Sequence, residues 1–158
     1  MRFRLATAIL AMLVASANLR GAEDLFLGTW KLNVGKSRIR SGPVSRSETL
    51  TIERAGDGVR VTIDGVTSRG AAFRINYTAN FDSRRYPHLD TSPQPPGLTV
   101  AVKRVDDRVL ERTTYLADRT LTTVRWVVSE DGAVMTATEI GVNAQRLMLN
   151  KVSVYERQ

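Results

Sequence analysis

The sequence predicts an all-β fold, an antiparallel up-and-down β-barrel of about eight to ten strands preceded by a signal peptide. Three observations support this prediction. Apolar and polar residues alternate with a period of two through most of the chain. Turns rich in glycine and aspartate separate the alternating segments. No segment after the apolar leader has helical periodicity, which excludes folds built from β-α-β units.

The first seventeen residues have the features of a signal peptide. Residues 1–4 are basic, residues 5–14 are apolar but too short to span a bilayer, and residues 15–17 supply a small-x-small cleavage pattern. We therefore expect residues 1–17 to be removed and residues 18–158 to form one domain. The mature protein is then expected to be secreted or periplasmic, without stable insertion into a membrane.

The strands follow from the alternation. The first covers about residues 27–34, and residues 35–47 lack periodicity and are expected to form a loop. Residues 64–65 are expected to form a turn. The proline-rich residues 83–97 are expected to form either a loop over a barrel mouth or a floppy connection. The other strands are expected at about residues 49–53, 59–64, 73–82, 98–102, 109–116, 120–129, 134–140 and 147–157.

Closure of the sheet is expected because about nine successive antiparallel strands would otherwise leave two exposed edges. Pairing of the first strand with the last removes both edges, which favours a barrel over an open sheet. A two-sheet sandwich is the main alternative, but it needs long crossovers for which this chain has little room. A barrel of eight or more strands is wide enough to hold one small ligand.

Both ends of the mature chain resemble a known family. Gly28-Thr29-Trp30 resembles the Gly-x-Trp signature of lipocalins and their calycin relatives, and residues 26–32 resemble the start of intracellular fatty-acid-binding proteins. Residues 152–157 are similar to the closing Arg-x-Tyr strand of those proteins. The mature chain also resembles small secreted lipocalin-like proteins of soil bacteria, which share segments such as residues 31–37.

The resemblance implies a calycin barrel in which Gly28, Trp30 and Arg157 form a structural signature. In calycins the tryptophan ring plugs one end of the barrel, and a basic side chain from the last strand lies across it. Arg157 matches that basic residue, and a guanidinium over an indole ring is a favourable cation–π pair.

Two departures from the fatty-acid-binding proteins limit what the resemblance implies about ligands. Residues 35–47 are too short and too broken for the helical lid of those proteins. Ser153 stands where they carry an arginine that grips the ligand carboxylate, although Tyr155 matches the tyrosine of that pair.

The candidate ligand-binding residues are Tyr155, Ser153, Arg125 and Tyr77. Arg125 and Trp126 point to opposite faces of one strand, so at most one of them lines the interior. An inward Arg125 would need an anionic partner such as a ligand carboxylate, whereas an outward one would lie in water. Tyr77 belongs to an apolar face and is expected in the core, with its hydroxyl reaching a polar partner.

The sequence offers no catalytic constellation and no metal site, and we expect no cofactor. His88 is the sole histidine and is expected in a surface loop, and cysteine is absent. Adjacent carboxylates occur at residues 106–107 and 130–131, where turns explain them. The net charge of +7 comes mostly from scattered arginines rather than from a basic patch, so no nucleic-acid partner is expected.

The expected function is that of a secreted lipocalin-like protein that binds a small hydrophobic or amphipathic molecule without catalysis. The alternative is an envelope protein-interaction module, an inhibitor or assembly factor, with a filled barrel that contacts another envelope protein. Small inward residues would favour the first function, and large inward aromatic residues the second. The chain has few aromatic residues, at 6%, which favours a cavity.

Overall fold

The computed structural model describes residues 24–92 and 94–158, so the predicted signal peptide lies outside the described residues. The described residues form eleven β-strands and contain no helix. The strands are β1 (Gly28–Ser41), β2 (Ser45–Ala55), β3 (Gly58–Thr67), β4 (Ala72–Asn80), β5 (Tyr86–Pro87), β6 (Leu89–Asp90), β7 (Leu98–Asp106), β8 (Val109–Leu116), β9 (Arg119–Val128), β10 (Val134–Val142) and β11 (Met148–Arg157).

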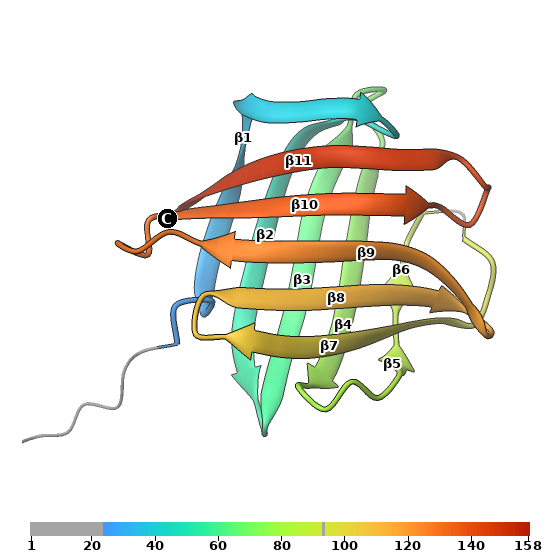
Figure 1. Ribbon diagram of the computed structural model, residues 1–158. Helices are drawn as coiled ribbons and strands as arrows, with labels where there is room; N and C mark the ends of the chain where they lie inside the picture. Colours follow the sequence, from blue (N-terminus) through green and yellow to red (C-terminus); the bar gives the residue numbers. More distant parts are fainter. Residues whose placement is uncertain (1–23, 93) are drawn as a thin grey trace, which may run out of the picture.

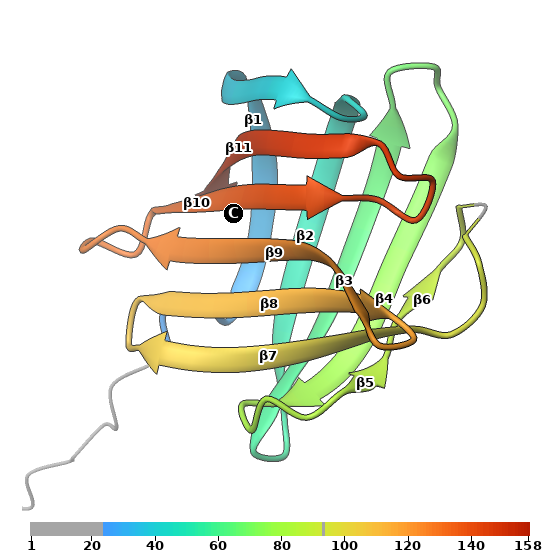
Figure 2. The same cartoon turned by 45° about the vertical axis from the view of Figure 1, so that its right-hand side comes forward.

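All eleven strands belong to one antiparallel sheet, which confirms the predicted all-β up-and-down barrel. The order is β5-β7-β8-β9-β10-β11-β1-β2-β3-β4-β6. The first and last long strands are hydrogen-bonded neighbours, with Lys31 opposite Glu156. Strands β7–β11 run across β1–β4 as a second layer, and both views show this arrangement (Figures 1 and 2).

The barrel is nearly closed, and its seam lies between β4 and β7. The short strands β5 and β6, both within the predicted proline-rich segment, pair with β7 and β4 respectively. These two-residue strands raise the count to eleven, above the eight to ten expected. Such short strands carry no alternation that a sequence could reveal.

The predicted loop at residues 35–47 is wrong, because β1 continues to Ser41 through a bulge. The pairing of β1 with β11 shifts between Asn33 and Arg38. The Ser37 hydroxyl donates to the Asn33 carbonyl at 2.7 Å and accepts from the Val154 amide at 3.0 Å. These bonds hold the extra residues against β11, so the strand is interrupted locally but does not end.

The predicted turn at residues 64–65 is also wrong, because β3 runs on to Thr67. Gly65 pairs with Phe73 across β3 and β4. A Cβ at Gly65 would lie 2.3 Å from the Phe73 ring. The glycine therefore serves packing inside a strand rather than a turn.

Trp30 plugs one end of the barrel, and Arg157 lies across it as the resemblance implies. The indole ring is 0% exposed, and its Nε1 donates to the Phe26 carbonyl at 3.0 Å. The Arg157 Cζ atom lies 4.2 Å from the ring centroid. Gly28 has a φ of +127°, and a Cβ there would lie 2.8 Å from the Arg157 guanidinium, so this position favours glycine on both counts.

Arg157 also ties three chain segments together. Its Nε donates to the Gly132 carbonyl at 2.7 Å and its Nη1 to the Leu27 carbonyl at 2.7 Å, while its Nη2 donates to the Leu25 carbonyl. The guanidinium thus joins the residues before β1 to the β9–β10 turn.

We expect Arg157→Ala to lower the free energy of unfolding by about 2 kcal/mol, because it removes charged hydrogen bonds and the cation–π contact. Urea unfolding followed by tryptophan fluorescence measures the change. Arg125→Ala, which removes an exposed arginine of β9, serves as the matched control and is expected to cost less than about 1 kcal/mol. Equal losses in the two variants would contradict the role assigned to Arg157.

Candidate functional site

A cavity of about 330 Å3 occupies the half of the barrel away from Trp30. The connections β1–β2, β6–β7 and β10–β11 border it through Val44, Ser92 and Asn143, and the end of β3 borders it through Thr67. We call this half of the barrel the open half and the half around Trp30 the closed half. Ser92 and Gln94, which follow β6, thus line the cavity, which agrees with the first of the two expectations for the proline-rich segment.

The closed half is filled by large side chains. Phe26, Trp30, Val61, Leu110 and Met135 are each 0% exposed. Along β8, the inward positions run from Leu110 through Arg112 to Thr114, and the last two line the cavity. The ring centroids of Tyr77 and Trp126 lie 5.9 and 5.8 Å from the Arg112 Cζ atom. Arg112 and Trp126 therefore form the floor of the cavity, and Tyr77 is buried beside Arg112 outside the cavity lining.

The upper walls are mainly apolar. Hydrophobic side chains from both layers line them, including Leu50, Ile63, Phe73, Ile75, Val124 and Leu149. Small side chains at Ala137 and Ser153, which lie opposite each other on β10 and β11, leave the space open. The cavity can thus take up apolar surface over most of its length.

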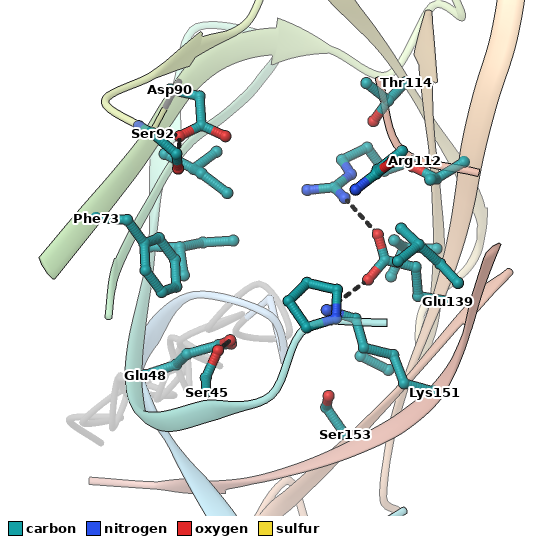
Figure 3. Close-up of a pocket in the computed structure, with 18 of the residues that line it drawn as sticks. Ser45, Glu48, Phe73, Asp90, Ser92, Arg112, Thr114, Glu139, Lys151 and Ser153 are labelled. Carbon is teal, nitrogen blue, oxygen red and sulfur yellow. Dashed lines mark hydrogen bonds and ion pairs between the residues drawn. The ribbon is translucent and has the colours of Figure 1, made fainter. Parts of the chain in front are cut away.

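A row of charged side chains crosses the wall of the cavity. Glu139 lies directly opposite Lys151, and Val124 stands between Arg112 and Glu139 in the same register. The Lys151 Nζ is 2.8 Å from a Glu139 oxygen, and the Arg112 Nη2 is 3.8 Å from the other. Figure 3 shows Arg112 pointing toward Glu139, and Glu139 pointing toward Lys151.

The charged row is well shielded from water, with side chains of Arg112, Glu139 and Lys151 that are 8, 14 and 20% exposed. Burial opposes ionisation of Glu139, but the charges of Lys151 and Arg112 outweigh it and keep the pKa of this carboxyl below its ordinary value. Burial also lowers the pKa of Lys151, but Glu139 outweighs that effect and raises it. The row therefore stays charged at neutral pH.

Two further carboxylates face the cavity and accept hydrogen bonds from neutral groups. Tyr155 donates its hydroxyl to Glu48 Oε2 at 2.5 Å, and Ser45 donates to Glu48 Oε1 at 2.6 Å. Ser92 donates its amide and its hydroxyl to Asp90 Oδ1 at 2.8 and 2.5 Å. Burial, with the charge of Glu48, raises the pKa of Tyr155 well above its ordinary value, so this phenol keeps its proton.

Four buried polar atoms in the described part of the chain have no hydrogen-bond partner, and all lie at or near the floor. They are Tyr77 Oη, both ring nitrogens of His88, and Arg112 Nε. The His88 and Tyr77 rings meet edge to face, with centroids 6.0 Å apart. Buried polar groups are normally paired, so this cluster indicates a place where a ligand or water binds.

His88 does not lie in a surface loop as expected, because its ring lines the cavity between β5 and β6. Burial and the nearby charge of Arg112 lower the pKa of His88 to about 4, although Asp90 opposes the shift. At neutral pH the imidazole is therefore neutral, with one nitrogen able to donate and the other able to accept.

The structure places two of the four candidate ligand-binding residues, Tyr155 and Ser153, in the lining of the cavity. Tyr77 is buried beside Arg112 and does not line the cavity, and burial raises its pKa to about 12 against the opposing charge of Arg112. Arg125 is instead on the outer face of β9, where it pairs with Glu111 on β8. Its neighbour Trp126 is the inward residue of that pair.

Sequence reasoning missed the charged residues that line the cavity, although a signal was present. Glu48 is in phase with the buried Leu50 and Ile52, and Lys151 with the buried Leu149 and Tyr155. A charged residue in phase with an apolar face marks a buried charge, which needs a partner inside.

We expect the His88 imidazole, the sole one in the untagged protein, to titrate near pH 4 by NMR rather than near 6.5. The unfolded chain then takes up a proton as the pH falls below 6.5 while the folded protein does not. The free energy of unfolding should therefore fall by about 1–2 kcal/mol between pH 7 and pH 5. His88→Gln should remove most of this slope, and an imidazole pKa near 6.5 would contradict the buried position.

Comparisons with known proteins do not assign a family or a function to this chain. Neither a scan against protein-family models nor a search of curated proteins gives a match for the chain.

Residues 24–92 and 94–158 contain no helix of the length and apolarity needed to cross a membrane. Over the same residues, no group of three or more histidine, aspartate or glutamate side chains is arranged to hold a metal ion.

Proposed function

We propose that this protein is a secreted or periplasmic lipocalin-like protein that binds a small hydrophobic or amphipathic molecule in the open half of its barrel. The observation that carries the proposal is the cavity of about 330 Å3, which lies at the small end of the usual range for ligand sites. Its walls are largely apolar and its floor carries unpartnered polar atoms. Burial of the ligand's apolar surface would supply the affinity, and the floor would orient a polar group.

Membership of the calycin superfamily is part of this proposal. The nearly closed barrel, the pairing of the first strand with the last, and the Arg157–Trp30 contact are compatible with it. Secretion is supported by the sequence of residues 1–17, which has the features of a cleaved leader.

A second candidate function is contact with another envelope protein. Val44, Leu147 and Met148, near the rim of the open half, are 42, 60 and 65% exposed, and exposed apolar side chains of this size can mark an interaction surface. The cavity favours the first function, because the interaction module was expected to have a filled barrel.

The most direct experiment is to purify the mature protein from its native host, extract it with solvent and identify any small molecule by mass spectrometry. A small neutral solvatochromic dye such as prodan provides a second readout. An empty extract together with no dye binding would count against ligand binding.

We expect Ala137→Phe to abolish dye binding, because Ala137 lines the cavity and is 6% exposed. Thr138→Phe is the matched control, since Thr138 pairs with the outward-facing Arg125, and it should leave binding unchanged. Thermal unfolding reports whether each variant folds, and Ser153→Leu replaces Ala137→Phe if that variant does not. Unchanged binding in folded cavity variants would place the ligand elsewhere.

A further inference from the structure

The charges that line the cavity leave no cation free for an anionic ligand. Glu48, Asp90 and Glu139 face Arg112 and Lys151, so the described lining carries three carboxylates and two cations. Glu139 lies within ion-pair distance of both cations. The neutral His88 adds no positive charge at neutral pH.

The remaining carboxylates act as acceptors that are already satisfied by the protein. Glu48 accepts from the Tyr155 and Ser45 hydroxyls, and Asp90 accepts from Ser92. Hydroxyl donors of this kind stabilise the ionised carboxylate without neutralising it. The interior therefore keeps a formal charge of −1 that a ligand would encounter on entry.

The atoms that still need partners belong mostly to neutral groups. His88, which lines the cavity, can both donate and accept a hydrogen bond, and Arg112 Nε can donate one. A hydroxyl or amide group, which both donates and accepts, would satisfy such a mixed set. A carboxylate accepts only, so it would leave the acceptor nitrogen of His88 unpaired.

We infer that the cavity selects a neutral molecule with an apolar body and one hydroxyl or amide group directed at His88 and Arg112, and that it rejects the matching carboxylate. This inference rests on the proposed function, because it names the chemical class of the ligand at the same site. A bound carboxylate would be a fourth acid facing two cations, and burial of an uncompensated charge is strongly unfavourable.

The test compares 1-decanol with decanoate at pH 8 as competitors of a bound neutral dye. The two probes share the same ten-carbon chain and differ at the head group, where the acid is ionised. We expect the dissociation constant of decanol to be at least about tenfold lower than that of decanoate. Equal or tighter binding of decanoate, or displacement of the dye by neither probe, would overturn the inference.

Two variants test separately how the charge of the cavity and its hydrogen bonds affect ligand binding. Asp90→Asn makes the formal balance zero, so it should strengthen decanoate binding several-fold relative to decanol binding. His88→Phe removes the unpartnered ring nitrogens, so it should weaken decanol binding about fivefold in the folded variant. An unchanged affinity for decanol in folded His88→Phe, or an unchanged ratio of the two affinities in Asp90→Asn, would contradict the corresponding step.

The outcomes distinguish this inference from the proposed function. Absence of any dye binding counts against the ligand-binding function as a whole. Dye binding with a preference for decanoate leaves that function in place and overturns the selection for neutral ligands alone.

Discussion

The pairing of β1 with β11 is the constraint on which the rest of the structure depends. It joins residues that are more than one hundred positions apart, such as Asn33 and Val154, and the Asn33 side chain also donates a hydrogen bond to Glu156. The same pairing brings Arg157 over Trp30. It also fixes β11 as a wall of the cavity, so that Lys151 faces Glu139 from the neighbouring strand.

The barrel is filled at one end and hollow at the other because of where large side chains fall along the strands. The inward positions of β10 change from Met135 in the closed half to Ala137 beside the cavity, where the small Ser153 of β11 lies opposite. Large residues near Trp30 exclude solvent and stabilise the fold, whereas the smaller residues leave room. The charged row, Arg112, Glu139 and Lys151, then lies in the cavity wall next to the tightly packed closed half.

The alternation of residues was enough to predict the fold class and the closure, because these depend on the period of two and on the exposed edges that an open sheet would leave. The Trp30 plug was instead implied by the resemblance of the two chain ends to calycins. The alternation could not show that β1 continues past Asn33, since that strand is held by a bulge whose bonds reach Val154, far along the sequence. It also left open whether Arg125 lies inside. Arg125 is outward because its neighbour Trp126 packs in the core.

Closure of the barrel is tested most directly by an engineered disulfide, which the absence of native cysteine makes unambiguous. Lys31 and Glu156 are directly opposite each other, whereas Val154 is opposite Asn33. We expect Lys31→Cys with Glu156→Cys to cross-link on mild oxidation in a folded protein, and Lys31→Cys with Val154→Cys to remain largely reduced, because diagonal partners lie about 7–8 Å apart. A reduced opposite pair, or equal cross-linking of both pairs, would contradict the pairing of β1 with β11.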